Sequence, residues 1–265
     1  MIVIGEKINA TRKSIAEALQ NRDEKTIIET ARAQADAGAD YLDVNGGDPH
    51  AGKEAENIEW LIALVQSNTD LPVAVDTADA EAARRGLDLA EAKPILNSIS
   101  LESERLKPLL PVAKEHECMV VALLMSDEGP PKGAEDRLAN AERLIGKLTD
   151  VGKNVDEIFV DPCLFPAASD PDSVRKCLEG VAAIRDKWPE VHISLGISNV
   201  SHGLPKRHHV NLAMLAQAIF MGADAGIVDP TAPGTMAMIY AAEALAGRDE
   251  FCMNYVTAAR EGKLG

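Results

Sequence analysis

Residues 72–98 read PVAVDTADAEAARRGLDLAEAKPILNS, and the alternation within them indicates the architecture. The stretch begins with a short apolar run, Pro72 to Val75, which ends in the polar pair Asp76-Thr77. A helical stretch rich in Ala, Leu and Glu follows over residues 79–89. A second apolar run, Ile95-Leu96, then ends in Asn97-Ser98. This pattern is typical of a buried strand, a helix and another buried strand.

The same alternation recurs along the whole chain. It predicts strands at 2–4, 41–44, 72–75, 95–96, 119–125, 158–160, 192–195 and 225–228, and helices at 24–37, 53–67, 79–89, 102–115, 134–150, 171–187, 210–221 and 234–246. Eight strand–helix units in 265 residues predict an α/β fold, a (β/α)₈ TIM barrel forming a single domain over residues 1–265. The alternative is a doubly wound open sheet, but that fold wants a glycine-rich loop where this chain has Gly5-Glu6-Lys7-Ile8-Asn9.

Composition excludes several classes of protein. The chain has 27 Lys and Arg against 42 Asp and Glu, a net charge of −15, and 3% aromatic residues. This balance disfavours binding to nucleic acid or to an anionic membrane surface. No run approaches the roughly 18 apolar residues of a membrane span, and the N-terminus lacks a signal-peptide core. The four cysteines show no CxxC spacing. We expect a cytoplasmic protein with reduced thiols.

Acidic and amide side chains stand where the expected strands end, which in a barrel is the active-site face. They are Glu6, Asn9, Asp43, Asn45, Asp76, Asn97, Asp127, Asp161, Ser198, Asn199 and Asp229. Carboxylates and amides side by side suit a neutral heterocycle with many N–H groups, such as a pterin or a guanine-like ring. Each is equally common as a helix cap or turn residue, and we favour that role for Asp229. The set lacks the ligand spacing of a catalytic zinc site, so we expect no bound metal.

The segment Gly196 to Pro205, GISNVSHGLP, closely resembles the seventh-strand signature of pterin-binding methyltransferases. Further matches, in the family's order and spacing, are Gly5 to Thr11, Tyr41 to Asn45, Val75 to Thr77, Asn97-Ser98 and Val160 to Pro162. The resemblance extends from Gly5 to Pro230. It is greatest to the free-standing 5-methyltetrahydrofolate:corrinoid (iron-sulfur) protein methyltransferases, because no corrinoid-binding or homocysteine-binding domain is attached.

The resemblance also implies roles for individual residues. Asp76, Asn97 and Asp161 fall where the family hydrogen-bonds the pterin ring, and Gly196 and Ser198 border that pocket. Asn199 falls at the contact to N5 of the methylated pterin, so Asn199 and Asp161 are the expected catalytic residues. Arg207 falls near the folate, whereas His202 departs from the expected Gln or Phe. Additional pocket candidates are Glu6, Asn9 and Asp43. Alternatively, Lys206 to His209 form a solvated loop, and Ser198 and Asn199 merely cap the following helix.

The implied reaction moves a methyl group between N5 of methyltetrahydrofolate and the Co(I) of a corrinoid carried by a partner protein. The displacement is in line, with N5 activated by protonation or hydrogen bonding. The direction is left open. The resemblance also implies a homodimer, to which Ala237 to Ala246 would contribute an interface unless that stretch is plain barrel packing. Two alternatives are a dihydropteroate synthase-like enzyme, whose Ser-Arg-Lys and Arg-x-His segments are absent here, and a carrier of pterin or corrinoid without catalysis.

Overall fold

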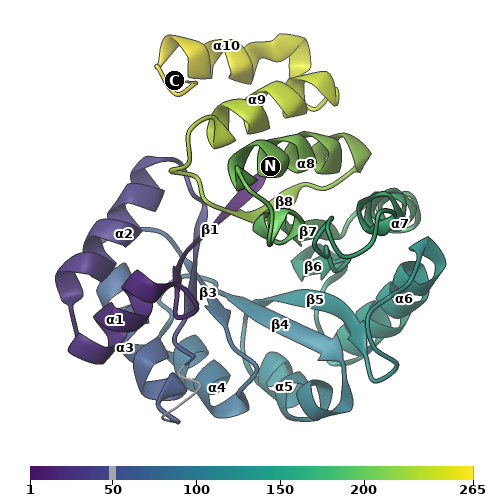
Figure 1. The fold of residues 1–265 in the computed structure, drawn as a ribbon. Helices are drawn as coiled ribbons and strands as arrows, with labels where there is room; N and C mark the ends of the chain where they lie inside the picture. The colour runs from purple at the N-terminus through teal and green to yellow at the C-terminus, as the bar shows by residue number, and fades with distance from the viewer. Residues whose placement is uncertain (48–51, 265) are drawn as a thin grey trace.

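The computed structural model describes residues 1–47 and 52–264, which form a closed barrel of parallel strands (Figure 1). Neighbours in the barrel follow chain order from β1 to β8, and β1 pairs in turn with β8. The strands are β1 (Ile2–Asn9), β2 (Tyr41–Asn45), β3 (Val73–Asp76), β4 (Ile95–Leu101), β5 (Met119–Ser126), β6 (Ile158–Asp161), β7 (His192–Gly196) and β8 (Ala225–Val228). The (β/α)₈ prediction is therefore confirmed.

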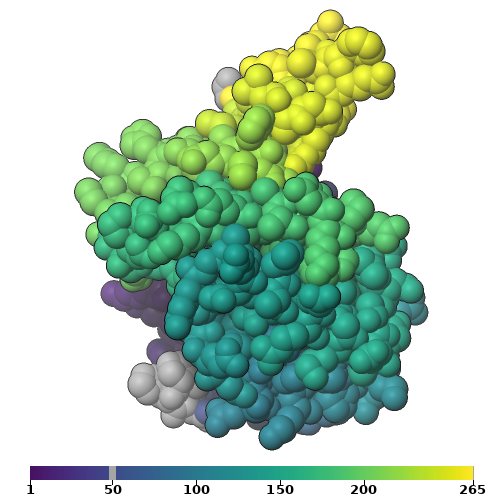
Figure 2. All heavy atoms as spheres, turned by 90° about the vertical axis from the view of Figure 1, so that its right-hand side faces the viewer, coloured from purple at the N-terminus to yellow at the C-terminus, as the bar shows by residue number. Residues whose placement is uncertain are grey.

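Helices surround the barrel. They are α1 (Lys13–Asn21), α2 (Glu24–Asp36), α3 (Glu54–Gln66), α4 (Ala80–Leu89), α5 (Ser103–Glu115), α6 (Ala134–Asp150), α7 (Ser173–Lys187), α8 (Arg207–Met221), α9 (Thr235–Leu245) and α10 (Met253–Arg260), with short 3₁₀ turns η1 (Val155–Glu157), η2 (Ile197–Ser201) and η3 (Glu250–Cys252). Helices α1 and α10 were not predicted. Helix α10 lies outside α9, so the C-terminal residues project from the barrel body (Figures 1 and 2).

The strands are apolar on both faces because both faces are buried. Inside the barrel, a compact cluster fills the space between the strands: Ile4, Ala74, Ile95, Val121, Phe159 and Ala225. Outward-facing residues such as Val73 and Val75 join the larger core beneath the helices. Close packing of the interior leaves the carboxyl ends of the strands as the place for a cavity.

Two strands extend more than one residue beyond their predicted ends. Strand β1 continues to Asn9 with a register shift against β2 between Gly5 and Ile8. Strand β4 continues through Asn97 and Ser98 to Leu101, with register shifts against β5. As a result, polar residues such as Glu6, Asn9 and Asn97 lie within the strands and not after them. Within the described residues, no helix has both the length and the apolar composition needed to cross a membrane.

Candidate functional site

A cavity of about 670 Å³ opens at the carboxyl ends of the strands. Its lining comprises Glu6, Asn9, Thr11, Arg12, Asp43, Asp76, Asn97, Asp161, Gly196, Ser198, Asn199, His202, Arg207, His208, Asn211, Ile227, Asp229 and Ala232. The structure therefore brings together all the residues that the resemblance assigned to the pocket, and Glu6, Asn9, Asp43 and Asp229 with them, but not Asn45 and Asp127. The volume suits a small organic molecule rather than a single ion.

Asp76, at the end of β3, is held by two amides. Asn9 Nδ2 and Asn45 Nδ2 donate to its Oδ2 at 3.3 Å and 3.1 Å. Asn45 Nδ2 also donates to the backbone carbonyl of Asp76 at 3.2 Å. Burial raises the pKa of Asp76 to about 6, although the Asn45 hydrogen bond lowers it. The carboxyl is thus fixed in place by neighbours that contribute no formal charge.

Asp43 and Asn97 form a second polar pair, on β2 and β4. Asn97 Nδ2 donates to Asp43 Oδ1 at 2.9 Å, and the side chains are 9% and 3% exposed for Asn97 and Asp43. Burial and the neighbouring Asp76 carboxylate raise the pKa of Asp43 well above its ordinary value. Because the Asn97 amide nitrogen donates one of its two hydrogens to Asp43, its carbonyl oxygen and its second N–H are left for a ligand.

Asp161 ends β6 on the opposite side of the cavity. Its Oδ1 accepts a hydrogen bond from the backbone N–H of Cys163 at 2.8 Å. Burial raises the pKa of Asp161 to about 6, while that hydrogen bond and the charge of Arg137 lower it. A carboxyl with such a pKa exchanges its proton near neutral pH, as acid–base catalysis requires.

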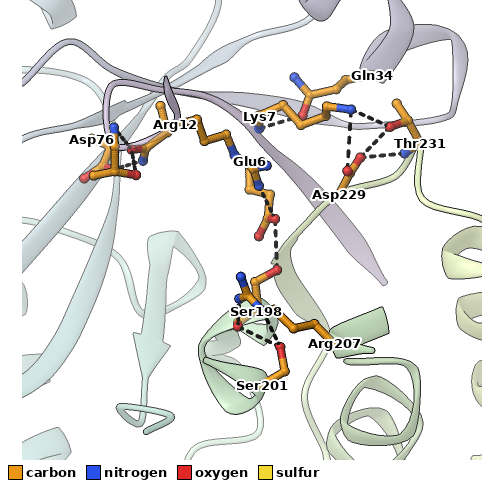
Figure 3. A network of polar contacts seen from close by, with 12 residues as sticks. Glu6, Lys7, Arg12, Gln34, Asp76, Ser198, Ser201, Arg207, Asp229 and Thr231 are labelled. Carbon is orange, nitrogen blue, oxygen red and sulfur yellow. Dashed lines mark hydrogen bonds and ion pairs between the residues drawn. The ribbon is translucent and has the colours of Figure 1, made fainter. Parts of the chain in front are cut away.

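The 3₁₀ turn η2 follows β7 and carries Ser198 and Asn199. Ser198 Oγ donates to Glu6 Oε1 at 2.9 Å, across 192 residues of sequence. Arg207, at the start of α8, donates from Nε to Ser201 Oγ at 3.0 Å and from Nη2 to the Ser198 carbonyl at 2.7 Å. Figure 3 shows that Glu6 and Arg207 both form hydrogen bonds with this turn. Asn199 itself remains exposed to solvent at the cavity.

Glycine is needed at position 196 because Asn199 lies against it. A Cβ atom on Gly196 would stand 3.0 Å from Asn199 Nδ2. Any side chain there would push the amide away from its position over the strand end. Gly196 therefore borders the pocket by leaving room for Asn199.

Glu6 links strand β1 to the η2 turn and to the segment before α1. Arg12 Nη2 donates to Glu6 Oε1 at 2.5 Å, and burial raises the pKa of Glu6 despite the Ser198 hydrogen bond and the Arg12 charge. Arg12 lies beyond the strand end, in the segment that leads into α1. The sequence analysis missed Arg12, Thr11, His208, Asn211, Ile227 and Ala232 as lining residues.

Three other interpretations have clear outcomes. Asp127 does not reach the cavity, because it accepts hydrogen bonds from Ser103 N and Oγ at 2.8 Å and 2.5 Å and so caps α5. Asp229 makes the turn expected of it, accepting from Thr231 N and Oγ1, and also pairs with Lys7 at 3.5 Å (Figure 3). Of the segment Lys206 to His209, expected as a solvated loop, Lys206 precedes α8 and the other three residues form its first turn, with Lys206, Arg207 and His209 exposed.

Metal-binding geometry is absent from the part of the chain that the structure describes. No group of three or more His, Cys, Asp or Glu side chains there is arranged to hold a metal ion. The free carboxyls and amides of the cavity instead offer hydrogen-bond acceptors and donors to an organic ligand.

Comparison with known proteins gives two results of different weight. The chain is 31% identical to a methylcorrinoid:tetrahydrofolate methyltransferase of Eubacterium limosum, over 100% of this chain and 98% of that protein. It is 27% identical to a methionine synthase of Mycobacterium tuberculosis, over 86% of this chain but only 20% of that protein. Relatives of the second kind are thus much longer than the part they share.

Solved structures of dihydropteroate synthases share the fold. One from Vibrio fischeri ES114 has a TM-score of 0.69 at 15% identity, covering 93% of both chains. One from Coxiella burnetii, in complex with pteroic acid, has a TM-score of 0.71 at 16% identity, covering 92% of this chain and 93% of that one. A family model described as pterin binding enzyme matches residues 5–229. The chain belongs to the family of pterin binding enzymes.

Proposed function

We propose that this protein is a methyltransferase that moves a methyl group between N5 of tetrahydrofolate and the corrinoid of a partner protein. The observation that carries the proposal is the conjunction of the carboxyl-and-amide cavity with full-length identity of 31% to a methylcorrinoid:tetrahydrofolate methyltransferase. Membership of the pterin binding family over residues 5–229 supports the same substrate class. The name of the relative favours methylcorrinoid as donor and tetrahydrofolate as acceptor.

The cavity has the groups that a pterin ring requires. A pterin presents an amino group beside a ring N–H on one edge, and a carboxylate accepts both at once. Asp76 supplies such a carboxylate, and Asn97 supplies an amide carbonyl nearby. Arg207 lies at the mouth, where it adjoins the exposed tail of a folate. The neutral ring would thus be held by hydrogen bonds instead of ion pairs.

The side chains of the site would also transfer the proton that N5 loses or gains during the reaction. Transfer of methyl to N5 makes that nitrogen more positive, and its proton must then leave; the reverse transfer needs the proton to arrive. Asn199 cannot supply a proton of its own, but its amide orients and stabilises a charged N5. Asp161, with its pKa of about 6, accepts or returns the proton, directly or through a water molecule.

The corrinoid acts as the second substrate, and its cobalt supplies the methyl-carrying chemistry. The exposed position of Asn199 leaves N5 accessible from outside the barrel. A corrinoid protein would therefore dock over the cavity mouth, with the partner's corrinoid face toward Asn199. The residues of this chain hold the pterin in line with the incoming group.

The first test is calorimetric titration of the purified protein with methyltetrahydrofolate, followed by addition of chemically reduced cob(I)alamin. We expect saturable binding, then loss of the Co(I) absorbance and growth of the methyl-cobalt band. Binding without transfer, even with a corrinoid protein supplied, would favour the carrier alternative. No folate binding would overturn the proposal.

The Asn199→Ala variant distinguishes a methyltransferase from a protein that only binds and carries the pterin. Because Asn199 is placed to stabilise N5 only as its charge develops, we expect kcat to fall on the order of a hundredfold with a smaller change in folate affinity. Equal loss of affinity and turnover would mean that Asn199 only binds the pterin. The control is His202→Ala, at an exposed lining residue, which should weaken folate binding more than it lowers kcat.

We also propose a single-domain protein of 265 residues that acts in the cytoplasm as a homodimer. The support for the homodimer is an apolar groove between α8 and α9. Phe220 and Leu245 there are 69% and 83% exposed, and Leu178, Ala216 and Met221 line the same groove. Large apolar side chains at such exposure are typical of a surface that another protein covers.

A further inference from the structure

A second cavity, of about 300 Å³, lies beside the barrel mouth between the N-terminal ends of α6 and α7. Its lining is Pro130, Pro131, Lys132, Arg137, Phe165, Ser169, Asp170, Ser173 and Lys176. The loops that follow β5 and β6 form most of it, so it opens on the same face as the proposed pterin site. The two cavities share no lining residue, although the charge of Arg137 reaches Asp161 of the proposed pterin site and lowers its pKa.

The charge of this cavity is opposite to that of the protein. Lys132, Arg137 and Lys176 face one carboxylate, Asp170. The barrel cavity, in contrast, has five carboxylates and two arginines, and the whole chain has a net charge of −15. Lys176 pairs with Asp170 at 3.1 Å and lies 4.0 Å from Asp172. The side chains of Lys132 and Arg137 make no ion pair within the described residues, although the Lys132 backbone N–H donates to Asp136 Oδ2 at 2.9 Å.

Arg137 is a buried cation that makes no ion pair within the described residues, and the carboxyl that its charge influences is Asp161. Its side chain is 2% exposed, and Nε and Nη2 donate to the carbonyls of Pro162 and Cys163 at 2.6 Å and 3.1 Å. The third hydrogen bond, from Nη1, goes to the Gly133 carbonyl at 3.1 Å. Carbonyl oxygens satisfy the N–H groups but do not neutralise the charge, and a buried charge is normally paired.

A buried hydroxyl in the same cavity has no partner. Ser173 is 8% exposed, and its Oγ makes no hydrogen bond within the described residues. Ser173 is the first residue of α7, a helix of 15 residues whose N-terminal end attracts negative charge. An unsatisfied hydroxyl, an unneutralised guanidinium and a helix N-terminus thus converge on one space.

From this convergence we infer that the cavity between α6 and α7 binds a small oxyanion, a phosphate or a carboxylate group. An oxyanion would accept the Ser173 hydroxyl proton, neutralise the charge that Arg137 and Lys132 leave, and lie at the end of α7. Pro130, Pro131 and Phe165 would cover the apolar side of the molecule that carries it. At physiological salt the Debye length is about 8 Å, so these local charges outweigh the remote acidic surface.

The test uses thermal unfolding and calorimetry of the whole protein with inorganic phosphate as the probe, against sodium chloride at equal ionic strength. We expect phosphate to stabilise the protein saturably, because a ligand that binds only the folded state does so. Ser173→Ala should weaken phosphate binding about tenfold, because it removes a hydrogen bond to a charged group. In the absence of phosphate, Ser173→Ala should be as stable as the wild type or more stable, because it removes an unsatisfied polar atom.

Matched variants make the outcome decisive. Lys132→Gln should also weaken phosphate binding, whereas Lys147→Gln, on the exposed far end of α6, should not. A second arm with acetate distinguishes a carboxylate ligand from a phosphate ligand, and either one supports the proposal if Ser173→Ala weakens its binding about tenfold. No saturable binding of either anion, equal losses in Lys132→Gln and Lys147→Gln, or dependence on Arg207 in place of Ser173 would overturn it.

Discussion

Asp161 gives the reaction a definite dependence on pH. Its pKa of about 6 lies within the range of ordinary assays. With methylcorrinoid as donor, the ionised carboxylate accepts the N5 proton, so kcat should rise with pH through about 6. Asp161→Asn should lower kcat on the order of a hundredfold and abolish this rise. The measurement is a pH–rate profile of single turnovers.

The control for this profile is Asp76→Asn, because the pKa of Asp76 also lies at about 6. We expect that variant to bind folate more weakly while its kcat still rises with pH. If the rise disappears in Asp76→Asn and persists in Asp161→Asn, the two carboxyls have exchanged roles.

The same raised pKa means that the ionised Asp161 lowers the free energy of unfolding near neutral pH. Its pKa of about 6, against 3.8 ordinarily, means that the folded protein retains a proton that the unfolded chain releases. The resulting stabilisation is complete below about pH 4 and is lost as the pH rises through 6. Asp161→Asn should therefore raise the free energy of unfolding at pH 7.5 on the order of 1–3 kcal/mol, with little effect at pH 4. Urea titrations at the two pH values would check this, and a less stable variant at pH 7.5 would contradict it.

Helix α4 depends on a glycine where it crosses β3. A Cβ on Gly86 would stand 2.8 Å from Val75 Cγ1 and 2.9 Å from Ile58 Cγ2, both fully buried side chains. We expect Gly86→Ala to lower the free energy of unfolding by about 1–3 kcal/mol, despite the better helix propensity of Ala. Gly146→Ala on α6, where a Cβ meets nothing within 4 Å, should raise it by up to about 1 kcal/mol. Stabilisation by both substitutions in urea titrations would refute the packing argument.

The elements that the sequence revealed are those with a strong pattern. Buried strands such as β3 are runs of apolar residues, and their helices follow at regular spacing. Helix α1 carried a signal that was not used, since Ile15, Ala18 and Leu19 are buried at helical spacing. Helix α10 has only Ala258 buried among its residues, so no apolar stripe marks it.

The site residues that could be predicted are likewise those whose position follows from the strand pattern. Strand-end residues such as Asp76 and Asp161 could be placed because barrel topology gathers all strand ends on one face. The prediction that Asp127 lies at the active-site face was wrong. Asp127 lies just after the last residue of β5, and its carboxylate binds the N-terminal end of α5. Arg12 and Asn211 reach the cavity from a loop and a helix, and their approach depends on backbone turns that periodicity does not encode.

We expect the protein to be a homodimer and two substitutions in the α8–α9 groove to dissociate it into monomers. Phe220→Ser combined with Leu245→Ser replaces both exposed apolar side chains of the α8–α9 groove. We expect light scattering to show half the wild-type mass, because removing buried aromatic anchors costs an interface most. Phe251→Ser, 87% exposed in η3 but outside the groove, should leave the mass unchanged. A wild-type protein of monomeric mass would refute the homodimer.

Closure of the barrel has a consequence for how the chain is made. Glu6 and Ser198 are partners separated by 192 residues, and β1 completes its pairing only with β8. At ribosomal speeds of about 5–20 residues per second, the first strand waits on the order of ten to forty seconds for its last neighbour. During that interval a nascent chain exposes an unpaired strand edge, which is a template for aggregation. The site is thus completed only after β8 has been made, and chaperones should engage this protein mainly before residue 228 emerges.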